Sequence, residues 1–270
     1  MNIRWLIMAG LLVASVGVLR AGDKEIKTAR AILDVNQQAL VEIRAVVKLS
    51  MESADLPLPN SNEAQHVMVS AVVIDPSGLA VASATLINPI SAIPAISFEI
   101  NGEKKSIAMK GVLSDIKMVM ADGTEIPAKL VLEDHDLDLA FFMPMHGDTD
   151  KPAAFRCVTC SARAKPDLFD KIVVIDRLSE TLNREATVGI HRINAIVEKP
   201  RTFFVSADLQ NISVPVFNLK KEFIGFAVTR IGQKSSDLSE MISRMANAGG
   251  SIVILPVQDI MSTAQQIKKK

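Results

Sequence analysis

Apolar and polar residues alternate along much of this chain, and the alternation predicts β-strands. Over 40–49 the odd positions are apolar, while several of the even positions carry charge. A period of two is typical of a strand with one buried face. Similar apolar runs predict strands over 67–74 and 79–87, joined by the turn signal Asp75-Pro76-Ser77-Gly78.

Turn signals and short apolar runs place more strands downstream. Asn101-Gly102 favours the positive-φ pair of a type I′ turn, so 96–100 and 106–109 are expected to form a hairpin. Two compact apolar runs, 170–177 and 186–197, predict the first strands of a second lobe.

Two stretches depart from the strand pattern and predict helices. The segment 25–38 is expected to form a short helix before the first strand. Over 235–250, Asp237 and Glu240 match a capping pattern, and apolar residues recur at helical spacing before two glycines. The methionine-rich stripe of this second helix is expected to pack on the sheet beside it.

The first residues predict a targeting segment. Arg4 precedes an apolar run over 5–19, and Ala21 offers a small residue for cleavage, as in a secretory signal peptide over 1–21. The run is shorter than the roughly 20 residues that span a bilayer, although an uncleaved N-terminal anchor is the alternative. We therefore expect an exported protein, periplasmic or secreted, with no membrane contact once the signal is cleaved.

Composition limits the partners that this chain can have. Removing Arg4 and Arg20 from the 30 basic residues leaves 28 against 30 acidic ones, so the mature chain carries no basic field. Aromatic residues make up 4% and tyrosine is absent, so no stacking platform is available either. Nucleic-acid binding is not expected. Roughly 250 mature residues suit one large all-β domain or two small lobes.

The segment 205–228, VSADLQNISVPVFNLKKEFIGFAV, resembles the nucleophile-bearing hairpin of trypsin-fold proteases, most closely those of the bacterial HtrA type. Matching positions lie on both sides of the active-site turn: Asn211, Pro215, Asn218-Leu219-Lys220, Glu222 and Ile224-Gly225. In this register Ile212 stands at the nucleophilic serine, and glycines are replaced at Gln210, Ser213 and Val214. An isoleucine side chain supplies no hydroxyl or thiol for acyl transfer.

Other segments carry the same resemblance. The run 69–87, VSAVVIDPSGLAVASATLI, matches the hairpin that leads into the catalytic histidine and puts Thr85 at that position. The run 136–140, DLDLA, matches the segment of the triad aspartate and puts Asp138 there. Threonine cannot accept a proton at neutral pH, so it cannot be the general base. Asp138 is therefore expected to bond backbone groups or Thr85.

The resemblance implies an all-β, chymotrypsin-like double antiparallel β-barrel with short N-terminal and C-terminal helices. The helix and first lobe are expected over 22–148, with an insertion at 88–117. A linker over 149–169 leads to the second lobe and C-terminal helix at 170–270. We do not expect the peptide-binding PDZ domain that often follows in that family.

The two cysteines, Cys157 and Cys160, lie in the expected linker. A local disulfide is the plainest interpretation for an oxidising compartment. Free thiols, a redox pair and a zinc site are the alternatives, although the thioredoxin-like context and two further zinc ligands are missing. The four histidines, at 66, 135, 146 and 191, show no ligand spacing, so neither a metal nor another cofactor is expected.

The sequence thus predicts a catalytically inactive protease homologue that binds an extended peptide or an envelope protein. One alternative is an active serine endopeptidase in which a one-residue shift makes Ser213 the nucleophile. The others are a structural envelope subunit and a redox or metal module at the two cysteines. The oligomeric state is left open.

Overall fold

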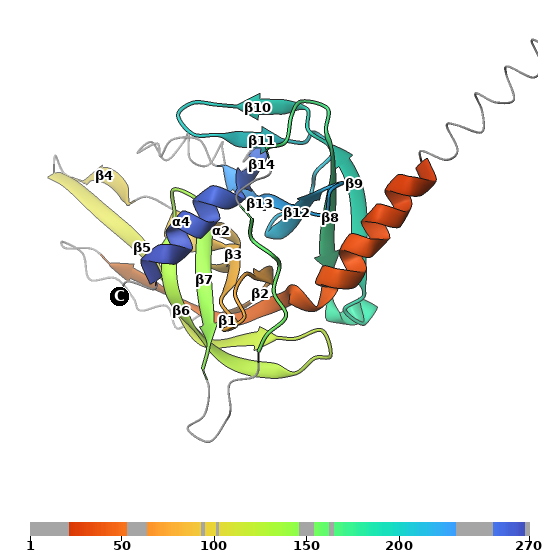
Figure 1. Ribbon diagram of the computed structural model, residues 1–270. Helices are drawn as coiled ribbons and strands as arrows, with labels where there is room; N and C mark the ends of the chain where they lie inside the picture. Colours follow the sequence, from red (N-terminus) through yellow and green to blue (C-terminus); the bar gives the residue numbers. More distant parts are fainter. Residues whose placement is uncertain are drawn as a thin grey trace, which may run out of the picture.

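The computed structural model describes residues 22–52, 64–92, 95–100, 103–145, 154–161, 165–230 and 251–267, and most of them form two antiparallel β-sheets (Figure 1). A helix over 22–36 precedes the sheets, and α4 (Val257–Ile267) follows them. The predicted all-β double-barrel class, with short helices near both ends, is confirmed. No helix of the described residues is long and apolar enough to cross a membrane.

The first sheet is a closed barrel. Its strand order is β1-β2-β3-β7-β6-β5-β4, and an additional pairing of β1 with β5 closes it. The odd positions of β1 from Val41 to Val47 are buried, as the alternation predicts. The strands are β1 (Leu40–Glu52), β2 (Ala64–Val73), β3 (Ala80–Ser83), β4 (Ile96–Ile100), β5 (Glu103–Val119), β6 (Glu125–Asp134) and β7 (Leu139–Pro144).

The predicted strand over 79–87 is wrong beyond Ser83. The chain turns there into a single helical turn, α2 (Ala84–Ile87), and a 3₁₀ turn, η2 (Pro89–Ala92), follows. Ser83 ends the strand because its side-chain oxygen accepts a hydrogen bond from the backbone N–H of Leu86 at 3.2 Å, which is an N-cap.

The segment 88–117, predicted as an insertion, contains a hairpin and part of a barrel strand. The expected hairpin is confirmed, since β4 pairs with β5 and Ile100 lies opposite Glu103. However, β5 continues for 17 residues and pairs with β1 from Ala108 to Val119. The second half of the segment is therefore a strand of the barrel.

The second sheet is curled. Its order is β10-β11-β14-β13-β12-β8-β9. The two end strands are consecutive in the chain, separated only by Ile193 and Asn194, so one bent segment borders the sheet at both ends. The strands are β8 (Lys171–Arg177), β9 (Ala186–Arg192), β10 (Ala195–Val197), β11 (Phe203–Val205), β12 (Val214–Asn218), β13 (Phe223–Arg230) and β14 (Ser251–Pro256).

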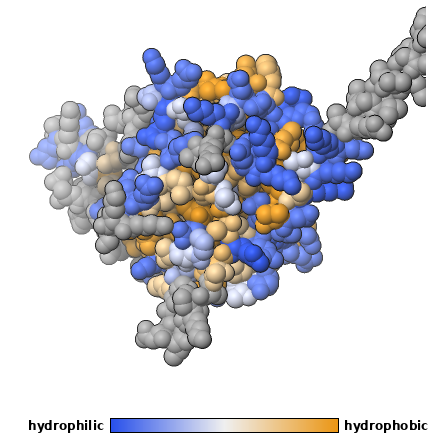
Figure 2. Space-filling view, in the orientation of Figure 1, coloured by the Kyte–Doolittle hydropathy of each residue, from blue (hydrophilic) through white to orange (hydrophobic). Residues whose placement is uncertain are grey.

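The two sheets share one hydrophobic core. Phe141 of the first sheet and Phe226 of the second are both fully buried in the same cluster, together with Ile32 of the first helix and Ile260 of α4. Each sheet also has a smaller cluster of its own. Figure 2, in the orientation of Figure 1, shows apolar residues near the centre of this face of the molecule, with hydrophilic ones around them.

The expected linker is partly packed against the first lobe. The backbone N–H of Phe155 donates to the carbonyl of Pro76 at 3.0 Å, and that of Val158 donates to the carbonyl of Val73 at 3.0 Å. The predicted signal segment 1–21 and the helix expected over 235–250 lie outside the described residues.

Candidate functional site

Asp138 lies in the turn between β6 and β7, and its carboxylate is bonded on both oxygens. The Ser83 hydroxyl lies 2.9 Å from Oδ1 and 2.8 Å from Oδ2. The backbone N–H of Thr85 donates to Oδ1 at 2.7 Å, and that of Thr229 donates to Oδ2 at 2.8 Å. Because Thr229 belongs to β13, this carboxylate joins the first lobe to the second.

Burial dominates the electrostatics of this carboxylate. Asp138 is 3% exposed. Desolvation raises the pKa of its carboxyl above the usual value, and the hydrogen bonds from Thr85, Thr229 and Ser83 offset only part of that shift. The side chain is held by three donors, which suits a structural group.

Thr85, which the resemblance matches to the catalytic histidine, is the second residue of α2. Its place in α2 lets its backbone N–H reach Asp138, so the two residues lie together as expected. The part that reaches the carboxylate in this bond is the backbone, whereas proton transfer would need a basic side chain.

Ser213 lies immediately before β12 and is 1% exposed. Its hydroxyl donates to the backbone carbonyl of Ser70 and accepts from the backbone N–H of Ser83 at 2.8 Å. Both of these partners belong to the first lobe. The hydroxyl therefore ties the lobes together, and neither of its partners is an imidazole.

The backbone at Ser213 keeps an unusual conformation. Its φ is 67°, in the left-handed region that glycine adopts most readily, and its N–H donates to the carbonyl of Ala227 at 2.8 Å. Ile212, at the predicted nucleophile position, is half-buried next to it. The turn before β12 thus forms with a serine in the left-handed conformation and an isoleucine before it.

We call the group of Ser70, Ser83, Asp138, Ser213 and Thr229 the inter-lobe clamp. Sequence reasoning missed three of its members. Ser70 and Thr229 contribute backbone groups, and Ser83 takes part because α2 begins there. The sequence marks these three residues only as small hydroxyl residues within or next to strands. This pattern does not show which distant residues they bond.

A second polar contact extends the clamp. The Ser70 hydroxyl donates to Asp176 Oδ1 at 3.0 Å, and Asn211 Nδ2 donates to Asp176 Oδ2 at 2.7 Å. Asn211 is one of the positions that carry the resemblance to the protease motif. In this structure its side chain holds the loop before β12 against Asp176 of β8.

The histidines of the described residues lie elsewhere. Nε2 of His135 is 3.6 Å from Glu133 Oε2, at the end of β6, and His66 and His191 lie on β2 and β9. His146 lies outside the described residues. Within the described ranges, no three His, Cys, Asp or Glu side chains gather where they could hold a metal ion.

The expected disulfide is not formed, since Cys157 and Cys160 are both free thiols. Cys157 packs against the core cluster of the first sheet, whereas Cys160 packs against the core shared by both sheets. A disulfide needs two Cβ atoms that face each other closely. These two side chains instead pack against different clusters. Burial raises the pKa of the Cys160 thiol to about 12.

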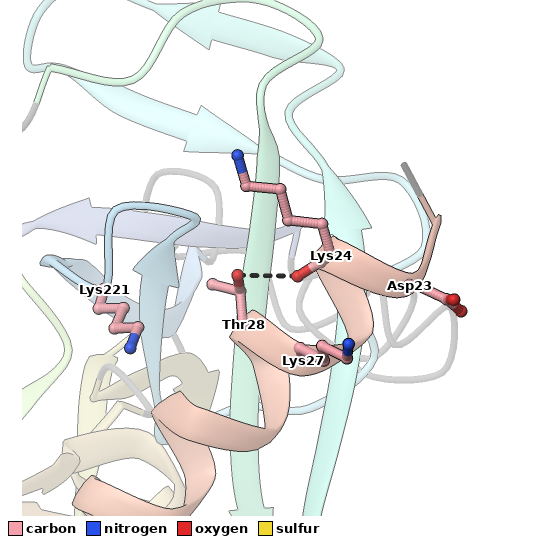
Figure 3. Close-up of a pocket in the computed structure, with 5 residues that line it drawn as sticks. All are labelled: Asp23, Lys24, Lys27, Thr28 and Lys221. Carbon is pink, nitrogen blue, oxygen red and sulfur yellow. Dashed lines mark hydrogen bonds between the residues drawn. The ribbon is translucent and has the colours of Figure 1, made fainter. Parts of the chain in front are cut away.

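A shallow hollow of about 410 Å³ lies beside the first helix (Figure 3). Its lining combines Lys24 and Lys27 of the helix with Lys221 of the turn after β12, which makes it basic. The Thr28 hydroxyl in this hollow donates to the carbonyl of Lys24 at 2.9 Å. None of the predicted site residues lies there.

Comparison of the chain with protein-family models found no matching family, and comparison with curated proteins found no matching relative. The HtrA-type resemblance therefore stays an argument from the motifs and from the double-barrel fold.

Proposed function

We propose that this protein is an exported, non-cleaving homologue of the HtrA-type proteases that holds extended polypeptide segments. The observation that carries the proposal is the inter-lobe clamp. Asp138 and Ser213, which stand at or beside two triad positions, have their polar atoms bonded to backbone and hydroxyl groups of the two lobes.

Hydrolysis needs a nucleophile, a base and an oxyanion site together. Ile212 cannot supply the nucleophile, and Thr85 cannot supply the base. Loss of triad members removes most of the rate and leaves only the contributions of binding and oxyanion contacts. Binding survives such losses, so a protease fold without its triad is suited to holding a chain by strand addition.

The alternative nucleophile, Ser213, is disfavoured by its surroundings. Its hydroxyl is buried and already donates to a backbone carbonyl, so no proton acceptor is available to activate it. A redox role for Cys160 is disfavoured in the same way, because reactive thiols need a lowered pKa and its pKa is raised.

A two-part experiment on the full chain tests the proposal. Reduced, carboxymethylated α-lactalbumin, which is permanently unfolded, is expected to bind saturably and to remain intact. A fluorophosphonate probe is expected to leave Ser213 unlabelled. Capture of one folded envelope partner without affinity for the unfolded chain would instead favour a structural subunit.

A further inference from the structure

Two neighbouring strands of the first barrel, β5 and β6, share only a short ladder and then diverge. The two strands pair only where Lys117–Val119 face Glu125–Pro127. Beyond these pairs β5 is bonded to β1 on one side, and β6 is bonded to β7 over Ala128–Asp134. No described strand pairs with the facing edges of β5 over Val112–Ile116 and of β6 over Ala128–Glu133, since β4 pairs with β5 only at Glu103–Ile107. We call Val112–Ile116 of β5 and Ala128–Glu133 of β6 the fork.

A bulge on each strand explains why the fork opens. In β5 the register with β1 shifts near Asp115, whose φ is 48°. In β6 the register with β7 shifts between Leu130 and Leu132. Bulges bend a strand and increase its local twist, so both strands turn away from their shared ladder. The opening therefore follows from the fold of both strands.

The fork borders a groove of about 610 Å³. Its apolar lining includes Val112, which is 55% exposed, and Met145, which is 48% exposed. Leu113, Ile116 and Leu130 also line it. Its charged side chains are two acidic and two basic ones, so the groove favours neither sign: Asp115, Glu133, Lys117 and Lys129.

Asn88 closes one end of the groove. Its Nδ2 donates to the carbonyl of Gly111 at 2.9 Å. Gly111 allows this approach, because a Cβ there would lie 2.1 Å from Asn88 Oδ1. On the edge of β5 that faces away from β1, the carbonyl of Gly111 is therefore bonded to a side chain. From Val112 to Ile116 no described strand pairs with this edge.

We propose that the fork binds an extended, uncharged apolar segment of another protein as an inserted strand, bonded to β5 on one edge and to β6 on the other. Facing strand edges offer main-chain donors and acceptors to such a segment, and the lining offers contacts for its side chains. This inference rests on the proposed function and places the bound polypeptide in the first lobe rather than between the lobes.

The geometry favours an unfolded partner over a second copy of this chain. A segment inserted between two strands needs both of its own edges free. The exposed end strands β9 and β10 each have one edge already paired, with β8 and β11. A strand that still belongs to a folded sheet cannot meet this requirement, whereas a segment of an unfolded chain can.

Val112→Asp in the full chain tests the site, with fluorescently labelled carboxymethylated α-lactalbumin as the probe. A charge in the apolar groove is expected to raise the Kd on the order of tenfold or more. Val188→Asp on the end strand β9 is the matched control, since Val188 is also an exposed apolar residue, at 38%, and its Kd is expected to stay at the wild-type value. Thermal unfolding checks that both variants fold.

Hydrogen exchange locates the bound probe independently. Amides of Val112–Ile116 and Ala128–Glu133 are expected to gain protection when it binds. Unchanged affinity in Val112→Asp, or protection only at β9 or at β13, would overturn the fork while leaving the proposed function standing. If the free chain forms a dimer that Val112→Asp abolishes, the fork binds a second copy of this chain, and the proposal of an unfolded partner is overturned. Absence of probe binding by the wild type would overturn the proposed function itself.

Discussion

At the scale of single residues, Asp138 combines deep burial with three hydrogen-bond donors. Because burial raises its pKa, the folded protein keeps this proton to a higher pH than the unfolded chain does. Between the two pKa values the folded state binds more protons, so the free energy of unfolding falls as pH rises and levels off above the folded pKa.

Asp138→Asn removes that titration. The free energy of unfolding of the wild type minus that of the variant is expected to fall as pH rises from roughly 4, the unfolded value of an aspartate. Urea denaturation at a series of pH values measures it. A difference that increases with pH would mean that the hydrogen bonds outweigh burial.

Ser213 allows its hydroxyl and its backbone to be separated. Ser213→Ala removes the bonds to Ser70 and Ser83 and keeps a side chain at positive φ, so we expect a loss of about 2 kcal/mol in the free energy of unfolding. Ser213→Gly removes the same bonds but suits the left-handed backbone, so it is expected to lose about 1 kcal/mol less. Equal losses in urea denaturation would contradict the backbone argument.

At the scale of elements, the close approach of β13 to β14 depends on Gly225. A Cβ there would lie 2.2 Å from the backbone oxygen of Leu255, which cannot move aside without breaking the pairing. Gly225→Ala is expected to cost about 3 kcal/mol of the free energy of unfolding. Gly22→Ala is the control, because a Cβ there would meet no atom within 4 Å outside its own helix. It should change the free energy of unfolding little. An equally small effect at both positions would show that β14 can shift.

Local chemistry made many elements predictable. Alternation marked β1, and proline and glycine marked the turn before β3, where Gly78 has a φ of 89°. The helical turn α2 was not predictable, because its Thr85 N–H depends on Asp138, which is 53 residues away in the chain. Such a bond leaves no periodic trace, so the apolar run to Ile87 predicts a strand throughout.

The candidate site shows the same division. The motifs brought Thr85 next to Asp138 correctly, because strand and turn patterns fix where these positions lie in a double barrel. The partners of Ser213 and the separate packing of Cys157 and Cys160 depend on which residues the two lobes bring together. Spacing in the sequence does not encode this information.

At the scale of the whole molecule, ion pairs reinforce the clamp between the lobes. Arg184 lies in the loop between β8 and β9. Its Nε is 3.3 Å from Oε2 of the buried Glu42 of β1, and its Nη2 is 3.0 Å from Oε2 of Glu180. Removing one partner of a buried pair leaves a charge without compensation. The loop between β8 and β9 therefore ties the second lobe to the first.

Arg184→Met is expected to lower the free energy of unfolding by about 2 kcal/mol, because the buried Glu42 loses its ion-pair partner and keeps only the nearby charge of Arg177. Arg201→Met, which removes the more exposed pair with Asp259, should change it by less than about 1 kcal/mol. Chemical denaturation followed by fluorescence of a label in each lobe measures both. Separate transitions for the two lobes in the wild type would contradict a shared core.

The central claim is that this protease-like body binds without cutting. The most direct measurement is intact mass spectrometry of the full chain and unfolded α-lactalbumin after prolonged incubation with a fluorophosphonate probe. We expect a saturable complex, an uncut α-lactalbumin chain and no adduct on Ser213. Cleavage products together with an adduct at Ser213 would contradict it.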